Sequence, residues 1–194
     1  ALAVGVILMA QMQTWRRGRA LVADRIRRGE RELVEVLDEA ESARVPGTAV
    51  FMFKELGKAP PALVNNLRHN KVLHKRIVFL TIMVEETPRV PEWERVEVEK
   101  MDAGFWRVRG RYGFMEEPDV PAALALCAPQ GLHVQAFETS YFLSRETVVS
   151  TPGGGMASWR ERLFAALSRN SSGVAKFFRL PDNAVVELGT RVQI

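Results

Sequence analysis

The sequence contains very little cysteine: Cys127 is the single one among 194 residues. One cysteine excludes an internal disulfide and is typical of a reducing compartment. The residues from Ala122 to Ala128 are otherwise alanine and leucine, so we predict that this thiol is a small buried hydrophobe. A catalytic nucleophile would need a nearby base, and that interpretation is the less favoured one.

Motifs of cofactor and metal chemistry are also missing. The glycines Gly153–Gly155 lack the lysine and hydroxyl of a phosphate-binding loop, and there is no dinucleotide-binding glycine pattern. Of three histidines, His69 and His74 are five residues apart with no third ligand following, whereas zinc needs three or four. His133 precedes a predicted strand and is interpreted as a loop residue. The sequence therefore predicts no enzyme, no metal and no cofactor.

No apolar run is long enough to cross a membrane, which takes about 20 residues. Ala1–Ala10 is uncharged and apolar, and it is followed by Trp15 and by Arg16–Arg19, a block of three arginines around one glycine. We interpret residues 1–17 as the end of a transmembrane helix, with Trp15 at the headgroups and the arginines in the cytoplasm. A signal peptide is excluded because its charge precedes its apolar core.

A buried helix of a soluble protein is the alternative for the same segment, since length alone does not separate the two. The arginines continue to residue 31, so residues 18–30 are interpreted as a basic juxtamembrane linker. Arginines near a membrane attract anionic lipid by about 1 kcal/mol each, and we expect this at Arg16–Arg19. An RNA-binding arm is less favoured because no nucleic-acid motif accompanies the charge, so no nucleic-acid partner is expected.

The remaining residues, 31–194, have the composition of one globular domain, since hydrophobic residues make up 47% of the chain and charged residues 26%. The net charge of +4 comes largely from the first thirty residues. We expect this domain to be cytosolic, and its balanced charge says little about its partners.

Hydrophobic periodicity predicts several elements in the first half of this domain. Residues 30–44 have the spacing of an amphipathic helix that ends at Pro46 and Gly47. Residues 48–53 are β-branched and aromatic and predict a buried strand. Pro60 and Pro61 can begin a helix. Residues 76–84 are almost entirely apolar, as expected of a central strand covered on both faces.

The second half predicts more strands than helices. Residues 95–99 and 105–114 alternate around a turn and predict a hairpin with one solvated face. Later strands are predicted at 134–143, with Phe137, Tyr141 and Phe142 as its bulky residues, at 146–149 as a pairing partner, and at 185–194. Short helices are predicted at 119–128, at 158–169 with Trp159 on its apolar stripe, and at 174–178. The fold class is therefore α/β or α+β, a mixed sheet covered by helices and preceded by the end of a transmembrane helix.

Polar residues gather near the end of the helix that begins at Pro61. The candidates for contact with a ligand or partner are Asn65, Asn66, His69, Asn70, Lys71 and His74. A second polar group, Glu138–Ser140, interrupts an apolar strand. It could line a pocket, although a buried polar ladder satisfied by its neighbours is the favoured interpretation.

Several blocks resemble the cytosolic C-terminal domain of the KUP/HAK/KT potassium uptake transporters. They occur in the family's order over about residues 14–194, and the most specific is Leu67–His74. The other blocks are Thr14–Gly18, Val45–Met52, Phe105–Val108, Tyr112–Phe114, Glu138–Ser144 and Val185–Ile194. Gly153–Gly155 has no counterpart in the family pattern, which leaves the role of that loop open.

The resemblance implies the C-terminal domain of a multi-pass protein of the cell inner membrane that imports potassium together with protons. Its ion-binding residues would lie in the transmembrane part, so no transport residue is assigned here. The implied partners are that transmembrane domain, a possible second copy of the chain, and a possible cyclic dinucleotide. Two hypotheses stay open: a regulatory or structural domain of the transporter, and a membrane-tethered sensor of a small ligand or nucleotide.

Overall fold

A computed structural model describes residues 2–29, 35–36, 43–54, 58–101, 104–149, 157–169 and 174–193. The chain forms two compact units. One comprises residues 1–30, 145–172 and 189–194, and the other comprises residues 31–144 and 173–188. We call them the helical unit and the sheet unit. The loop at Gly153–Gly155 and most of the helix predicted at 30–44 lie outside the described residues.

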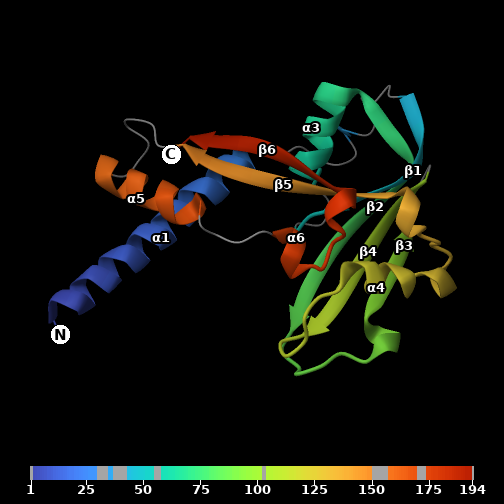
Figure 1. Ribbon diagram of the computed structural model, residues 1–194, viewed down its shortest axis with the longest axis horizontal. Helices are drawn as coiled ribbons and strands as arrows, with labels where there is room; N and C mark the ends of the chain where they lie inside the picture. The colour runs from blue at the N-terminus through green and yellow to red at the C-terminus, as the bar shows by residue number, and fades with distance from the viewer. Residues whose placement is uncertain are drawn as a thin grey trace. The chain divides into compact units, whose positions relative to one another are not determined.

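Six strands form one mixed sheet, as predicted (Figure 1). In sheet order they are β3 (Val96–Lys100), β4 (Phe105–Gly113), β2 (Val72–Glu85), β1 (Ala43–Met52), β5 (Thr139–Val149) and β6 (Val185–Gln193). The pairs β4–β2, β2–β1 and β1–β5 are parallel, whereas β3 runs antiparallel to β4. The boundary between the two units falls within β5 and within β6.

Helices cover both faces of the sheet unit, which makes the protein an α+β fold. The helix α3 (Pro61–Asn70) packs on a face that includes Phe51 and Phe79. The helix α4 (Val120–Ala125) packs on the other face, with Val50 and Val78, and Figure 1 shows the two helices on opposite sides. Alternate residues of β1 and β2 enter the two cores because neighbouring side chains of a strand point to opposite faces.

Local sequence explains where these helices begin. Proline is accepted in a first helical turn, and α3 begins at Pro61, where the Ala62 amide donates to Ser144 Oγ at 3.0 Å. Asp119 caps α4, since its carboxylate accepts from the Ala122 amide at 2.9 Å. Shorter helical turns are η1 (Glu92–Glu94), η2 (Ala128–Gln130), η3 (Ala136–Glu138), α6 (Val174–Phe177) and η4 (Asp182–Ala184).

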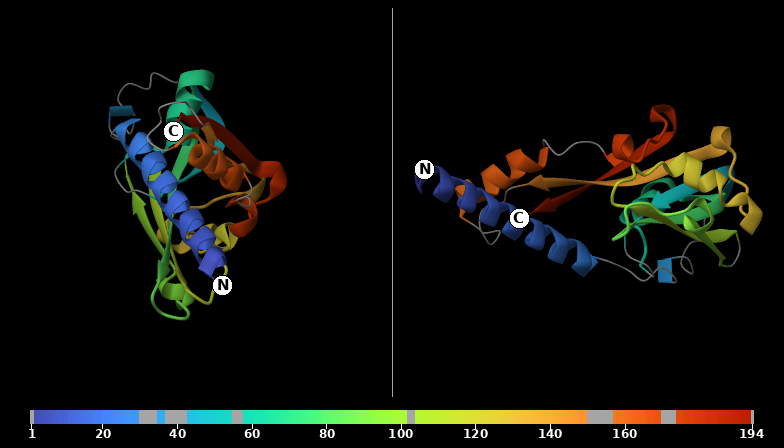
Figure 2. Two further views of the ribbon diagram at one scale, coloured as in Figure 1. Left: turned by 90° about the vertical axis from the view of Figure 1, so that its left-hand side faces the viewer. Right: turned by 90° about the horizontal axis from the view of Figure 1, so that it is seen from below.

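The helical unit is built on α1 (Leu2–Gly29), an unbroken helix, and α5 (Ser158–Arg169) beside it (Figure 2). Its core joins Val22, Phe164 and Val192, and the Trp15 ring lies 5.3 Å from the Phe164 ring. A Cβ on Gly18 would lie 2.4 Å from Phe164, so the two helices approach closely there. Among the described residues, no helix is both long enough and apolar enough to span a membrane.

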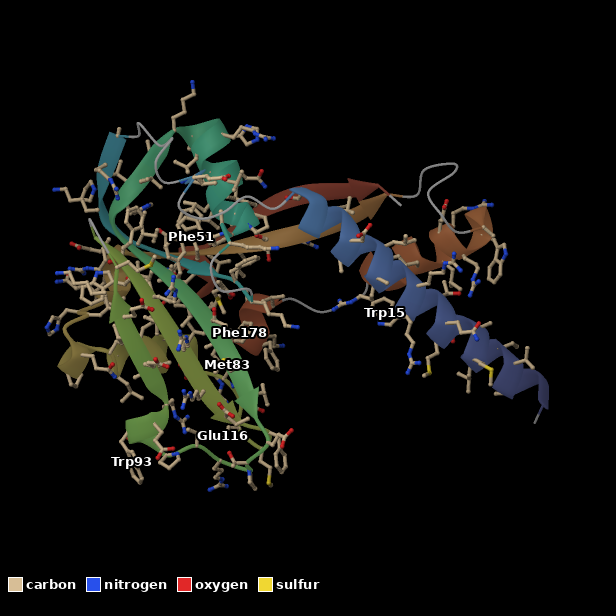
Figure 3. All side chains as sticks on the ribbon, turned by 180° about the vertical axis from the view of Figure 1, so that it is seen from behind. Trp15, Phe51, Met83, Trp93, Glu116 and Phe178 are labelled. Atoms are coloured by element: carbon tan, nitrogen blue, oxygen red, sulfur yellow. The ribbon has the colours of Figure 1, made fainter. Side chains whose placement is uncertain are left out.

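One carboxylate ties together the loops at the ends of β2 and β4 (Figure 3). Glu116 accepts from the amides of Gly113 at 2.7 Å and Val90 at 2.9 Å, and from the Arg95 guanidinium at 2.6 Å. These hydrogen bonds, that from Gly113 first, lower the pKa of Glu116 to about 2. The carboxylate is therefore ionised at neutral pH, which favours all three bonds.

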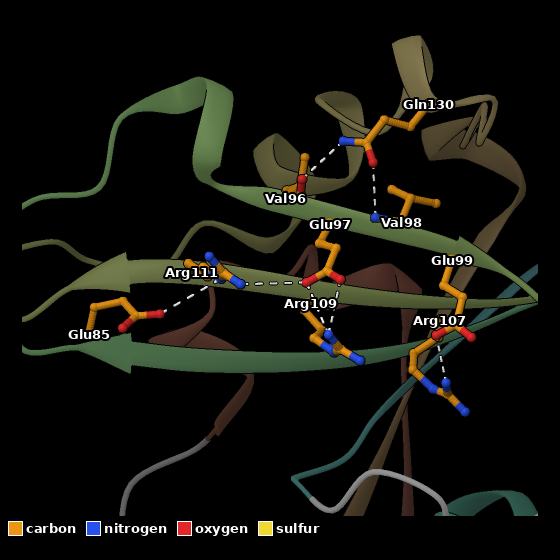
Figure 4. A network of polar contacts seen from close by, with 9 residues as sticks. All are labelled: Glu85, Val96, Glu97, Val98, Glu99, Arg107, Arg109, Arg111 and Gln130. Carbon is orange, nitrogen blue, oxygen red and sulfur yellow. Dashed lines mark hydrogen bonds and ion pairs between the residues drawn. The ribbon is translucent and has the colours of Figure 1, made fainter.

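The hairpin β3–β4 is confirmed, and one of its faces carries charge (Figure 4). Ion pairs join Arg107 to Glu99 at 2.6 Å and Arg109 to Glu97 at 3.0 Å. On the free edge of β3, the Gln130 amide accepts from the Val98 amide and donates to the Val96 carbonyl, both at 3.0 Å. One side chain thus occupies backbone groups that a further strand would use.

Several predicted boundaries and contacts were wrong. Ala43 and Arg44, predicted helical, already belong to β1, which continues through Pro46 and Gly47. The strand predicted at 134–143 begins only at Thr139, after a helical turn. Residues 146–149 continue that strand instead of pairing with it.

Two aromatic side chains of the predicted apolar segments are exposed. Phe137 is fully exposed, at 105% of its reference area, and Trp159 is 57% exposed. An alternating apolar pattern does not reveal whether a neighbouring element is present to cover a side chain.

Candidate functional site

A pocket of about 550 Å³ opens at the amino ends of β1 and β5, within the sheet unit. This size is within the range of small-molecule sites. The pocket is formed by segments far apart in the sequence, namely the start of β1, one residue of β2, the turn before β5 and the turn before β6. Its lining residues are Pro46, Gly47, His74, Ala136, Phe137, Glu138, Thr139, Ser140, Pro181, Asn183 and Ala184.

An irregularity in β1 shapes the pocket. The register with β2 shifts between Val45 and Thr48, and Gly47 has φ +99°. A Cβ on Gly47 would lie 2.8 Å from the Glu138 carbonyl oxygen. Glycine is the residue that adopts this conformation without a steric penalty. The bulge therefore lets β1 approach the turn before β5 at the mouth of the pocket.

His74 is the titratable group of most interest in the pocket. Burial lowers the pKa of its imidazole, so the ring is neutral at neutral pH and has one donor and one acceptor nitrogen. The ring contacts Phe142 edge-on, with the centroids 5.8 Å apart. Its Nδ1 atom is buried and has no hydrogen-bond partner among the described residues. The imidazole thus belongs to the lining of the pocket, while Nδ1 itself is not exposed.

The lining residues include one acid, Glu138, and no lysine or arginine. Two arginines nearby donate to backbone carbonyls: Arg44 to that of His74 at 3.1 Å, and Arg76 to that of His133 at 2.5 Å. The pocket therefore suits an uncharged planar group better than a phosphate. No cluster of His, Cys, Asp and Glu in the described part of the chain has the arrangement of a metal site.

The six predicted site residues divide into two groups. His74 lines the pocket, whereas the other five lie at α3 or directly after it. There, the buried Asn66 donates to the Val72 carbonyl and accepts from Asn70, both at 2.8 Å. These bonds hold the turn at Lys71, which has φ +54°. Asn65 is half-buried, and His69 and Lys71 are exposed. Asn66 and Asn70 thus stabilise the turn from α3 to β2.

Comparison with known families identifies the family of this chain. Residues 46–194 match the family model described as the K+ potassium transporter C-terminal domain. The chain belongs to the KUP/HAK/KT potassium transporter family.

Curated members of this family are similar over the whole chain. It is 51% identical to "Probable potassium transport system protein Kup 2" of Albidiferax ferrireducens, and 50% identical to "Probable potassium transport system protein Kup" of Azoarcus sp.. A protein with the latter name from Myxococcus xanthus is 48% identical. Each match covers 100% of this chain but only 30–31% of the relative. The chain thus spans about a third of their length. No solved structure matches.

Sequence reasoning on this member of the potassium transporter family missed most of the pocket. Glu138–Ser140 do line the pocket, which was the less favoured interpretation. Thr139 is also buried, and its hydroxyl donates to the Gln135 carbonyl at 2.6 Å. Gly47 was singled out as a helix terminator and as part of a family block, but not as a site residue. Asn183 and Phe137 carried no signal of a site, because a pocket assembled from four separate segments leaves no local pattern.

Proposed function

We propose that this chain is the cytosolic regulatory domain of a potassium–proton symporter of the cell inner membrane. The observation that carries the proposal is the match of residues 46–194 to the C-terminal domain of potassium transporters. The relatives are about three times as long as this chain. Potassium and protons would be carried by the membrane-spanning part of the full-length protein, and this domain would need no cofactor of its own.

The amino-terminal helix supports attachment to that part. The apolar side chains of α1 from Val4 to Met9 are 59–66% exposed, and exposed arginines follow at Arg16, Arg17 and Arg19. An apolar segment followed by arginines is the pattern of a helix leaving a membrane on the cytoplasmic side. We therefore keep residues 1–17 as the end of the last transmembrane helix and 18–30 as a basic segment beside anionic lipid. A homodimer stays a prediction.

A regulatory domain acts by favouring one conformation of the transporter over another. It can do so only to the extent that its contacts differ between the two conformations. Typical couplings of this kind change an affinity about 5- to 150-fold. Removal of the domain should therefore change how potassium uptake depends on external potassium and pH more than it changes the ion pathway itself.

The test is potassium uptake by cells that produce the full-length protein with or without residues 31–194. Membrane levels of both forms are matched by quantitative blotting, and uptake is followed at several external potassium concentrations and pH values. We expect the truncated form to reach the membrane and to lose part of its response to those conditions. Unchanged uptake and unchanged regulation would remove the regulatory role.

A sensor of a small ligand is the second candidate, and the pocket at His74 favours it. About 550 Å³ of space, a neutral imidazole in the lining and the exposed Phe137 ring suit a planar heterocycle such as a nucleobase. Because no arginine or lysine lines the pocket, the phosphates of a nucleotide or cyclic dinucleotide would lie outside it. A regulatory domain can use such a ligand, so the two functions are compatible.

Calorimetry of this chain against cyclic di-AMP and ATP tests the second candidate. His74→Ala should weaken binding about tenfold, as expected when an aromatic ring that packs against the ligand is lost. His69→Ala is the matched control, because His69 is exposed on α3 and outside the pocket. Absence of binding heat at high micromolar ligand, or an equal loss of affinity in both variants, would count against ligand binding at this pocket.

A further inference from the structure

Four exposed apolar side chains belong to the end of β2 and to the segments that follow β2 and β4. Val84 is 63% exposed, Trp93 82%, Phe114 59% and Met115 67%. Trp93 and Glu116 lie at the same end of the sheet (Figure 3). Exposed apolar patches on soluble proteins often mark binding sites, and tryptophan is enriched among the residues that dominate binding interfaces.

The backbone holds these side chains in one place. The Phe114 amide donates to the Thr87 carbonyl at 3.0 Å, and the Met115 amide donates to the Pro88 carbonyl at 3.2 Å. Glu116 then links both loops through Val90 and Arg95. The segments 84–95 and 113–116 are therefore a connected and ordered surface, not independent loops.

Acidic residues adjoin each apolar group along the chain. Glu85 and Glu86 follow Val84, Glu92 and Glu94 flank Trp93, and Glu116 and Glu117 follow Met115. We call the four apolar residues with these six glutamates the acidic apolar surface.

The surface has an excess of negative charge. Glu85, Glu116 and Glu117 have arginine partners, at Arg111, Arg95 and Arg179 respectively. The exposed Glu86, Glu92 and Glu94 form no ion pair with a described residue, and Arg89 is the single exposed cation between them in the sequence. Three glutamates against one arginine leave the surface acidic. A complementary partner is therefore both apolar and basic.

We propose that the acidic apolar surface binds a basic amphipathic segment on the cytoplasmic side of the transporter's own membrane-spanning part. The proposal rests on the proposed function. The short cytoplasmic loops of membrane proteins carry an excess of lysine and arginine, which is the chemistry that this surface complements. Anionic lipid would be repelled by the glutamates, and so would the same surface of a second copy.

The first experiment measures binding by the 194-residue chain of an 18-residue amphipathic peptide made of leucine and lysine. The same peptide with glutamate in place of lysine, and phosphatidylserine vesicles, are the comparison ligands. We expect saturable binding of the lysine peptide and not of the glutamate peptide, with a blue shift of tryptophan emission that is absent in Trp93→Ser. Vesicles can bind the basic segment at residues 18–30, but they should give no shift that depends on Trp93. Equal binding of the acidic peptide, or binding to the vesicles through Trp93, would overturn the proposal.

Charge variants separate this surface from non-specific attraction. The triple variant Glu86→Gln, Glu92→Gln and Glu94→Gln should weaken binding of the lysine peptide about tenfold, since three exposed ion pairs are lost. Trp159→Ser and Asp182→Asn are matched controls, because both residues are exposed and lie outside the surface and outside the pocket. Equal weakening by the control variants would overturn the assignment.

The second experiment identifies the partner in the full-length protein. A photo-crosslinking amino acid replaces Trp93 in membranes, and the cross-linked peptides are identified by mass spectrometry, with position 137 as the control. We expect a cross-link from position 93 to a lysine- or arginine-rich segment of the same polypeptide's membrane part. Cross-links to lipid or to the same surface of a second copy, or a yield no higher than at position 137, would overturn the proposal.

The two proposals fail separately. If binding and cross-linking are lost while removal of residues 31–194 still alters uptake, the docking surface is wrong and the regulatory role stands. If removal of the domain leaves uptake and regulation unchanged while the cross-link forms, the surface is confirmed as a structural contact and the regulatory role is lost.

Discussion

Glu116 shows how much a single side chain contributes in this protein. Its carboxylate bonds two backbone amides and one guanidinium from segments 3 to 26 residues away. Only 15% of its side-chain area is exposed, so water does not replace these bonds readily. The loops that carry the acidic apolar surface depend on this one residue.

Glu116→Gln should lower the free energy of unfolding at pH 7 by about 1.5–3 kcal/mol, the usual loss for hydrogen bonds to a charged group. Urea unfolding measures the change. Glu117→Gln is the control, because that neighbouring glutamate is 77% exposed, and its removal should change stability by no more than about 0.5 kcal/mol. Equal losses in the two variants would contradict the assigned role.

The effect of Glu116 should also depend on pH. Its pKa is about 2 in the folded protein and 4.5 in its unperturbed form, so the folded carboxyl binds fewer protons between these values. Its stabilisation is therefore complete above pH 4.5 and is lost as the pH falls through about 2. The stability difference between wild type and Glu116→Gln should narrow over that range, and a constant difference would contradict the linkage.

Cys127 is expected to be chemically inert in the native protein. It is fully buried, its thiol contacts the Ala123 carbonyl at 3.4 Å, and burial raises its pKa to about 11. Because only the thiolate reacts with disulfide reagents, Ellman's reagent should label it at neutral pH only after unfolding. Rapid labelling of the folded chain would show that this part of the core opens easily.

Helix packing within the helical unit depends on the absence of one side chain. At Gly18 a Cβ would lie within 2.5 Å of the Phe164 ring, whereas nothing lies within 4 Å of a Cβ at Gly5. Gly18→Ala should destabilise this unit by about 1–3 kcal/mol through overpacking. Gly5→Ala should instead stabilise it by up to about 1 kcal/mol, as alanine favours the helix. Thermal unfolding compares them, and equal stability of the two variants would contradict this packing.

The free edge of β3 is protected by Gln130. Unpaired edge strands recruit other strands and promote association, and the Gln130 amide occupies the Val98 N–H and the Val96 carbonyl. Gln130→Ala should cost about 1 kcal/mol and increase self-association in light scattering as concentration rises. Gln135→Ala, on an exposed loop, is the control. A monomeric Gln130→Ala variant would show that the charges of β3 suffice as protection.

At the scale of the whole chain, the two compact units have separate cores. The described core of the helical unit contains three buried apolar residues, whereas each face of the sheet unit has a larger cluster. We expect two calorimetric unfolding transitions, with the helical unit unfolding at the lower temperature. Val22→Ala should lower that transition alone, and Val78→Ala should lower the other. A single transition that both variants shift equally would contradict independent cores.

Most strands and helices of the protein were predictable because each depends on neighbouring residues. The apolar run 76–84 predicted the central strand β2, Pro61 predicted the start of α3, and the turn near Gly104 predicted the β3–β4 hairpin. The strand predicted before Thr139 was wrong. Its alternating pattern fits a strand as well as the helical turn that forms there, and Phe137 is fully exposed. His74 was a candidate from the start, but its grouping with the α3 residues was not supported by the structure.

The sequence by itself determined the family, the elements and the hydrophobic faces, because motifs and periodicity are written in contiguous residues. Tertiary structure alone decided the strand order, the pocket between His74 and Asn183, the bond from Gln130 to the edge of β3, and the backbone bond between Phe114 and Thr87. Each of these joins residues distant in the chain. Their proximity follows from how two cores are filled at once, and no local pattern carries that information.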